Sequence, residues 1–300
     1  MNKPNFIIAG EAKAGTTALY SYLTQHPDVF VCEPKEPRYF AFQGARPSFT
    51  GYMDEEWVNE TTIYDRASYY RLFEQANGMK SVGEASPVYV HIPGCASAIA
   101  KELPDVKIII LLRNPVRLAF SAYQHMARVG VEKLTFEQAL DQEDERIENN
   151  WAWHWRYRSL GFVAKNIESF LQHFPRDQIL FLNYDEFQSD NMASLKRVCD
   201  FLEIESDFDF KPTRVNVNVR ARLVWLGNML RARDNHIKNF LRAILPKPVR
   251  QRMGEMAMKL NSAPMKETIS DETYRSLLSI YRRDIEETER LTHLDLKKWY

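Results

Sequence analysis

Cysteine is scarce in this sequence, and neither sign of charge prevails. The 300 residues include three cysteines, and 40 lysines and arginines balance 40 aspartates and glutamates. The cysteines are widely spaced (positions 32, 95 and 199), which argues against a disulfide framework and against a cysteine-based zinc site. A neutral chain is also a poor match for a protein that coats nucleic acid. We therefore expect a reducing environment, no nucleic-acid partner and no metal.

Long hydrophobic stretches are missing as well. No run of about 18 apolar residues occurs, so we expect no membrane insertion. Residues 10–15 form a charged loop where a secretion signal needs apolar residues, which favours a cytoplasmic location. With 45% hydrophobic and 27% charged residues, the chain is typical of a soluble globular protein. Its length suits one large α/β domain or two small ones, and because no linker divides the chain we expect a single domain over residues 1–300.

The beginning of the chain carries the strongest pattern. Residues 5–23 read NFIIAGEAKAGTTALYSYL: an apolar stretch, a loop bounded by two glycines, and an amphipathic helix pattern. Glycines let several backbone N–H groups converge at the start of a helix, where unpaired donors and the helix dipole attract anions. Lys13 adds a positive charge, and Thr16 and Thr17 add hydroxyls. This combination predicts an oxyanion site.

The loop departs in one respect from the usual nucleotide-binding pattern, G-x-x-x-x-G-K-[ST]. Both glycines and Thr17 match this pattern, but Thr16 occupies the lysine position. The lysine of this loop, Lys13, lies three residues earlier. The simpler interpretation is a glycine turn beside a solvated lysine, and it requires the strand, glycines, lysine, threonines and helix to coincide by chance.

Strand and helix patterns alternate along the chain. The clearest strand is predicted at residues 106–112, where apolar and β-branched residues suit burial on both faces of a parallel sheet. Helices are predicted between the strands and near the carboxyl end. This alternation predicts an α/β fold, a doubly wound parallel sheet with helices on both faces. The other predicted strands are residues 6–9, 29–32, 81–84 and 178–182.

Two cations directly follow strands of this sheet. Lys13 comes after the first strand, and Arg113 comes after the strand at 106–112, which we expect to be central. Ligands of such sheets bind outside the carboxyl ends of the strands, so the pair predicts a ligand with two separated anionic groups. Ser121, in the second turn of the next helix, could share one anion with Arg113. Taken singly, a structural salt bridge for Arg113 and a plain surface role for Ser121 are equally good interpretations.

Two further segments are rich in aromatic side chains. Residues 41–65 show no clear period and are interpreted as an irregular insertion that shapes a pocket or lid. Trp151, Trp153, Trp155 and Tyr157 alternate with polar residues, so they line a groove or, as is more common, belong to the core. A groove of this kind would suit a flat, apolar ligand.

Three motifs resemble those of one enzyme family. KAGTTAL at 13–19, KEPRYF at 35–40 and RNPVRLAFSAYQH at 113–125 are similar to sulfotransferases that use 3'-phosphoadenosine 5'-phosphosulfate (PAPS). The resemblance is to the branch of heparan-sulfate sulfotransferases and bacterial small-molecule enzymes. It implies a P-loop-containing nucleotide-binding fold and transfer of a sulfuryl group from PAPS to a hydroxyl, or an amine, of a small-molecule acceptor. Adenosine 3',5'-bisphosphate (PAP) would be the second product.

The resemblance also implies a set of PAPS-binding residues. Segment 215–222, VNVNVRAR, is similar to the family's late segment that closes over the cofactor, so two of its arginines are weaker candidates. The implied ligands of the 5'-phosphosulfate are Lys13, Ala14, Gly15, Thr16 and Thr17; those of the 3'-phosphate are Arg113 and Ser121; the weaker candidates are Arg220 and Arg222.

Three side chains are candidates for the general base. A glutamate in the family's second motif serves as base, and the matching residue here is Glu36. Glu84, which ends a predicted strand, and His91 could reach the same edge, and a related branch of sulfotransferases uses a histidine. Glutamates are mostly solvated and lone histidines mostly structural, so these two rank behind Glu36. The carbohydrate enzymes carry a lysine at the place of Ala85, which puts a polysaccharide acceptor in doubt.

Sulfuryl transfer needs few groups. It requires in-line placement, neutralisation of charge on the leaving phosphate oxygen and removal of the acceptor's proton; Lys13 can perform the second task and Glu36 the third. A sulfuryl group carries less charge than a phosphoryl group, so a metal is less necessary. Arg113 stands where a kinase would carry an acidic magnesium ligand. The alternatives are a P-loop kinase or NTPase and a non-catalytic module that binds nucleotide or sulfated ligands.

Overall fold

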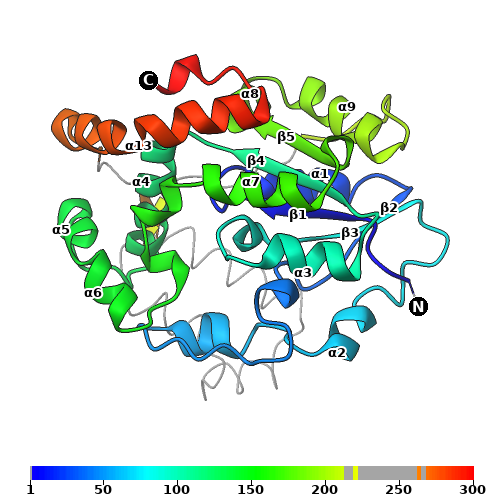
Figure 1. Ribbon diagram of the computed structural model, residues 1–300, viewed down its shortest axis with the longest axis horizontal. Helices are drawn as coiled ribbons and strands as arrows, with labels where there is room; N and C mark the ends of the chain where they lie inside the picture. The colour runs from blue at the N-terminus through cyan, green and yellow to red at the C-terminus, as the bar shows by residue number, and fades with distance from the viewer. Residues whose placement is uncertain (1, 213–218, 222–261, 265–267) are drawn as a thin grey trace.

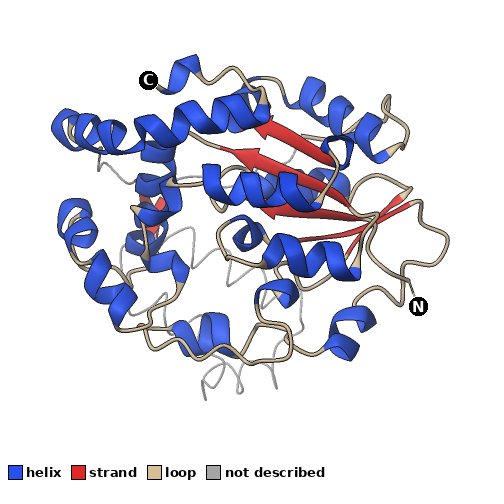
Figure 2. Cartoon of the chain, in the orientation of Figure 1, coloured by secondary structure: helices blue, strands red, loops and turns tan. Residues whose placement is uncertain are grey.

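One five-stranded sheet organises the chain. The computed structural model describes residues 2–212, 219–221, 262–264 and 268–300. Within these ranges all five strands run parallel, and helices cover both faces of the sheet (Figures 1 and 2). The predicted α/β fold is confirmed. The strands are β1 (Phe6–Gly10), β2 (Val29–Val31), β3 (Ser81–Ala85), β4 (Lys107–Leu112) and β5 (Ile179–Asn183).

The strand order is β2-β3-β1-β4-β5, which makes β1 the central strand. The expectation that β4 is central was therefore wrong by one position, since β4 lies between β1 and β5. Every residue of β1 is buried, as are Ile108 to Leu112 of β4, because helices cover both faces. From β1 the chain goes first to one side, through β2 and β3, and then to the other side at β4. The switch point of the sheet, where ligands of such folds bind, thus lies between β1 and β4.

A layer of helices covers each face of the sheet. On one face α1 packs beside α8 and α9, where Tyr22 contacts the ring of Phe187 and hydrogen-bonds to Asn191. On the other face α3, α7 and α13 lie next to one another (Figure 1). The α-helices are α1 (Thr16–Leu23), α2 (Arg66–Arg71), α3 (Cys95–Glu102), α4 (Pro115–Arg128), α5 (Phe136–Asp141), α6 (Glu143–Glu148), α7 (Ala164–His173), α8 (Tyr184–Ser189), α9 (Asn191–Leu202) and α13 (Asp271–Thr292).

A short, capped turn joins β4 to α4. The side chain of Asn114 accepts the N–H of Arg117 at 3.0 Å, and α4 begins at Pro115, whose missing N–H costs nothing in the first turn. Asn114 also donates to the backbone oxygen of Trp299 at 3.0 Å, which ties the carboxyl-terminal segment to this turn. Arg113 is therefore held at the edge of the sheet.

The aromatic segment at 151–157 belongs mainly to the core. Trp155 and Tyr157 are 1% and 0% exposed, and Trp153 is also buried. The groove interpretation was therefore wrong, although Trp151 stays partly exposed. Packing explains the alternation, because the rings of Trp155 and Tyr157 enclose the buried guanidinium of Arg146.

Asp54 anchors the insertion at 41–65 to this aromatic segment. Its fully buried carboxylate accepts the N–H of Ala152 at 2.8 Å and the Nε1–H of Trp155 at 3.0 Å. Nε2 of His154 lies 2.9 Å from the same carboxylate. Burial raises the pKa of Asp54, but these partners outweigh it and lower the pKa overall. The insertion contains a short π-helix, Glu55–Asn59.

Helix α13, near the carboxyl end of the chain, is attached to the start of α7. Asp284 of α13 accepts backbone N–H groups at the start of α7, from Val163 at 2.9 Å and Ala164 at 3.2 Å. A small antiparallel pair, β6 (Val219–Ala221) with β7 (Ser262–Pro264), lies beside α4. All three cysteines are buried thiols without a disulfide.

Within the described ranges, every helix is too short or too polar to span a bilayer.

Candidate functional site

The loop between β1 and α1 is shaped to receive an anion. Gly15 has φ +90° and is the N-cap of α1, and no side chain of the described residues caps the helix there. The first N–H groups of α1, at the positive end of the helix dipole, suit an anionic ligand. A Cβ at Gly15 would come within 3.1 Å of Tyr184, so both conformation and space favour glycine. Ala14 and Thr16 are buried, whereas Thr17 is exposed.

Two hydrogen bonds tie Arg113 to this loop. Its backbone N–H donates to Oε2 of Glu11 at 2.9 Å, and its Nη1 donates to the backbone oxygen of Lys13 at 2.8 Å. The guanidinium lies 4.5 Å from the ring centroid of Tyr184. The sequence predicted two cations for separated anionic groups. The structure places the head group of Arg113 against the backbone of Lys13, because β1 and β4 are neighbours, and the two side chains stay predicted ligands of separate anionic groups.

Burial and neighbouring positive charges make the ammonium of Lys13 easier to deprotonate. Burial, followed by the positive charges of Arg128 and Arg113, lowers the pKa of Lys13 to about 8, while Glu36 acts in the opposite direction. Lys13 is therefore mostly charged at neutral pH and loses its proton in the mildly basic range. An anion bound at the loop would relieve the repulsion among these cations.

Two of the other predicted phosphate ligands, Ser121 and Arg220, lie on or beside α4. Ser121 is partly exposed in the second turn of this helix. Arg220 belongs to β6, whose backbone lies next to α4. Arg222 falls outside the described residues, as do residues 215–218 of the same segment. The structure thus brings the backbone of Arg220 towards the helix that carries Ser121.

Glu36 lies on a loop, residues 33–38, that is attached to the end of β3. Its N–H donates to the backbone oxygen of Ala85 at 3.0 Å. Its Oε1 lies 2.6 Å from Nζ of Lys35, and its Oε2 lies 3.3 Å from Nη2 of Arg38. Burial raises the pKa of Glu36, but the two cations outweigh it, so the pKa is lowered overall. The Glu36 side chain remains 35% exposed and can meet a ligand.

Glu84 lies close to this loop but is completely enclosed. Its carboxylate accepts hydrogen bonds from the hydroxyls of Tyr69 at 3.0 Å, Ser86 at 2.6 Å and Tyr89 at 2.7 Å. None of its surface is exposed, and burial raises the pKa of Glu84 to about 7. An acceptor could reach Glu84 only if the surrounding residues moved.

His91 directly follows a 3-10 turn, Pro87–Val90, that packs against the end of β1. Burial lowers the pKa of His91 to about 4, so the imidazole is neutral at physiological pH. Its Nε2 is enclosed and has no hydrogen-bond partner among the described residues. His91 thus differs from Glu36, which two cations hold at the edge of the site.

The sequence prediction missed two residues of this site, Glu11 and Tyr184. Glu11 is buried and accepts the backbone N–H of Arg113, and burial raises the pKa of its carboxyl to about 8. A carboxylate repels anions, so the residue type of Glu11 did not indicate that it belongs to an anion site. Tyr184 packs on Gly15 and stacks on Arg113. It directly follows β5, and this position at the carboxyl end of a strand was the available signal.

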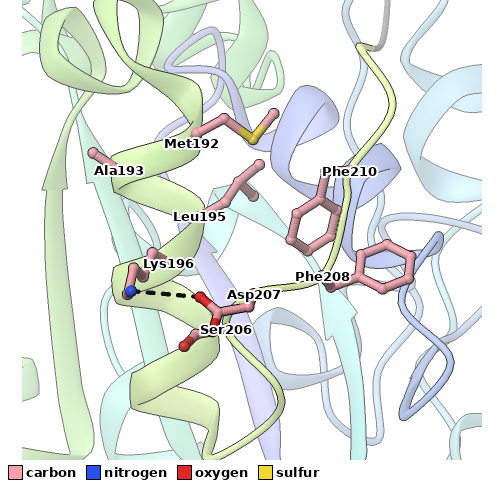
Figure 3. Close-up of a pocket in the computed structure, with 8 residues that line it drawn as sticks. All are labelled: Met192, Ala193, Leu195, Lys196, Ser206, Asp207, Phe208 and Phe210. Carbon is pink, nitrogen blue, oxygen red and sulfur yellow. Dashed lines mark ion pairs between the residues drawn. The ribbon is translucent and has the colours of Figure 1, made fainter.

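A shallow hollow of about 290 Å³ lies elsewhere, between α9 and residues 206–210 (Figure 3). Its lining is largely apolar, and Lys196 and Asp207 form an ion pair at 3.6 Å across its edge. None of the predicted site residues lines it, so the candidate site remains at the strand ends. Within the described ranges, no three histidine, cysteine, aspartate or glutamate side chains are grouped as in a metal site.

Comparison with solved structures gives a match over the whole chain. The crystal structure of a sulfotransferase from Alicyclobacillus acidocaldarius is 31% identical in sequence and superposes with a TM-score of 0.78. The match covers 100% of this chain and 99% of that one. The two chains therefore share their fold.

Comparison with curated proteins gives partial matches. Membrane-associated sulfotransferase kil1 of Dictyostelium discoideum is 31% identical over 171 residues, which are 55% of this chain and 33% of that protein. Heparan sulfate glucosamine 3-O-sulfotransferase 3B1 of Mus musculus is 29% identical over 209 residues, 67% of this chain and 46% of that protein. The chain thus spans less than half the length of these curated relatives.

The model of the sulfotransferase family matches residues 4–209. This range contains β1 to β5, the glycine loop, Glu36 and Arg113. The chain therefore belongs to the sulfotransferase family, as its three motifs predicted.

Proposed function

We propose that this chain transfers a sulfuryl group from PAPS to a hydroxyl, or an amine, of a small-molecule acceptor, with Glu36 as general base. One observation carries the proposal: in a chain of the sulfotransferase family, the backbone of Glu36 is hydrogen-bonded to the end of β3, and Lys13 follows β1, the strand that pairs with β3. A proton acceptor and an anion-binding cation thus face the same strand ends, as this transfer requires.

The donor set at these strand ends fits PAPS. Among the described residues, the enclosed Nε of Arg113 has no hydrogen-bond partner and no side chain caps the start of α1. We assign the 5'-phosphosulfate to residues 13–17 and the 3'-phosphate to Arg113 and Ser121, with Arg220 and Arg222 as additional ligands. When bound, PAPS supplies an activated sulfuryl group on a phosphate leaving group.

Lys13 and Glu36 have complementary tasks in this proposal. The ammonium of Lys13 stabilises the negative charge that develops on the leaving phosphate oxygen. The carboxylate of Glu36 takes the proton of the acceptor hydroxyl. Lys35 and Arg38 occupy one lone pair on each carboxylate oxygen, which leaves the other lone pairs for the acceptor. The lowered pKa of Glu36 keeps it ionised at neutral pH, so it is ready to receive this proton.

The surroundings of Ala85 support a small acceptor. Its side chain is 0% exposed, so this position carries no group that could reach a ligand. The resemblance places a lysine here in the carbohydrate enzymes. Heparan sulfate, which appears in the name of the Mus musculus relative, is therefore the second acceptor class to test. The single domain over residues 1–300 and the cytoplasmic location stay predictions.

A transfer assay tests this function. The protein is incubated with PAPS labelled with sulfur-35, with EDTA present, and with phenols, sugars, amines or heparan sulfate as acceptors. We expect labelled product without magnesium from at least one small acceptor. Turnover that requires ATP and magnesium would instead support the kinase or NTPase alternative. PAP binding with no transfer to any acceptor would support the non-catalytic alternative.

A further inference from the structure

Arg38 is a nearly enclosed arginine that joins separate parts of the site. Its Nη2 lies 3.3 Å from Oε2 of Glu36, and its Nη1 donates to Oγ1 of Thr61 at 2.9 Å. Its guanidinium also lies 5.8 Å from the ring centroid of Trp153. The side chain is 14% exposed, so Arg38 is not a solvated surface charge.

The backbone of Arg38 is held as firmly as its side chain. Its N–H donates to Oγ of Ser86 at 3.1 Å, and this hydroxyl in turn donates to the buried carboxylate of Glu84 at 2.6 Å. Its φ is +60°, a left-handed conformation that a residue with a side chain adopts only where its surroundings maintain it. The buried Glu84 thus supports the loop that carries Glu36.

Thr61 orients the guanidinium from the other side. Its hydroxyl donates to the backbone oxygen of Trp57 at 2.6 Å, so its lone pair is directed at Arg38. Thr61 and Trp57 belong to the insertion at 41–65, which Asp54 anchors to the segment at 152–155. A chain of contacts therefore runs from the core, through the insertion and Arg38, to the carboxylate of Glu36.

We propose that Arg38, oriented by Thr61, is a positioning residue that fixes the carboxylate of Glu36 for proton removal. The insertion then takes part in the reaction without touching the reacting atoms. This role rests on the proposed function of Glu36. The charged groups that act on or pair with Glu36 are Lys35, Arg38, Lys13 and Glu84. Without Arg38 two cations remain, so the carboxylate becomes easier to protonate.

Neighbouring threonines provide a matched test. Thr61→Val removes the hydroxyl that orients Arg38 while keeping the shape of the side chain, and Thr61→Ser restores the hydroxyl. Thr62→Val is the control, since Thr62 is 5% exposed and its hydroxyl has no hydrogen-bond partner among the described residues. Arg38→Gln removes the charge, and Arg38→Lys keeps it without the forked geometry.

The readouts are kcat and KM as functions of pH with the acceptor that the wild-type protein uses, together with the melting temperature. For Arg38→Gln we expect kcat to fall by about 10- to 100-fold, with the acid limb of its pH profile moved up by about one unit. Thr61→Val should lower kcat by about 3- to 10-fold at unchanged KM for PAPS. Arg38→Lys should be intermediate, and Thr61→Ser and Thr62→Val should match the wild type.

A second measurement does not depend on transfer. The ¹³C resonance of the Glu36 carboxyl, identified by its loss in Glu36→Gln, is titrated in the wild type and in Arg38→Gln. We expect a higher pKa in the variant, and an unchanged pKa would overturn the role of Arg38. Wild-type kcat profiles for Arg38→Gln and Thr61→Val beside an inactive Glu36→Gln would also overturn it, while leaving Glu36 as base. An active Glu36→Gln would instead overturn the base itself.

Discussion

Glu36 and Glu84 lie close together at the end of β3, and their surroundings are opposite. Two cations pair with Glu36, which is one-third exposed and has a lowered pKa. Three hydroxyls enclose Glu84, which is fully buried and has a raised pKa. Ser86 connects the two regions, since it donates to Glu84 and accepts the N–H of Arg38. The difference teaches that its surroundings suit one glutamate to the proposed role of general base and the other to the support of the loop.

The largest effect should come from exchanging each carboxylate for its amide. Glu36→Gln should lower kcat by about 10³-fold because it removes the general base. PAP affinity, measured by calorimetry, should stay within about threefold, since Glu36 is not assigned to the cofactor. Glu84→Gln should lower kcat by less than about tenfold, because it acts only through the loop. Equal losses in the two variants would break the comparison.

The next prediction concerns PAP binding by Lys13, the cation on which the charge of Glu36 acts. Lys13→Ala should weaken PAP binding by about 10- to 100-fold, since it removes a charge-assisted contact from a partly desolvated site. Wild-type affinity should be nearly full at pH 6.5 to 7 and fall as the pH rises through about 8, because the lowered pKa of Lys13 means that the ammonium loses its proton in that range. Calorimetric titrations between pH 6.5 and 9.5 check this. An affinity that is flat across this range would contradict the assignment.

The pH dependence of stability should separate the two glutamates by sign. The pKa of Glu84 is raised to about 7 in the folded protein, so its contribution to stability is full below pH 4.5 and declines as the pH rises to 7. Glu84→Gln should therefore cost about 1–3 kcal/mol at pH 5 and less at pH 8, as measured by urea unfolding. The pKa of Glu36 is lowered, so its contribution is present above pH 4.5 and is lost at lower pH.

The smallest effect is expected at His91, the remaining candidate base. His91→Leu should keep kcat within about threefold, because Nε2 of the imidazole is enclosed. Its lowered pKa means that its contribution to stability is full above pH 6.5 and is lost as the pH falls towards 4. Urea unfolding of His91→Leu should therefore show a flatter pH dependence between 4 and 6.5. A loss of kcat comparable to that of Glu36→Gln would transfer the role of base to His91.

Local patterns predicted most elements of the sheet. The apolar run at 106–112 predicted β4, and the glycine loop after residues 6–9 predicted the β1-to-α1 turn. These signals depend on the period of neighbouring residues, which a single segment contains in full. The central place of β1 was missed because strand order depends on contacts between segments far apart in the sequence.

The same distinction between local sequence patterns and contacts of distant segments holds for the site. Lys13 and Arg113 were singled out by their places directly after predicted strands, and Glu36 by the family resemblance of its motif. The hydrogen bond from Arg113 to the backbone of Lys13 joins residues 100 positions apart, so no local sequence pattern predicts it. The burial of Trp155 and Tyr157 was likewise undecided by their alternation, because grooves and cores use the same aromatic side chains.

The sequence by itself determined the fold class, the family and the residues that can carry charge to the strand ends. Only the tertiary structure decided which of these charges are exposed, paired or enclosed. The physical reason is that the pKa and reach of a carboxylate depend on the dielectric and the charges around it, and distant segments supply both. Glu36 and Glu84 differ for this reason, although each is a glutamate at the edge of the same sheet.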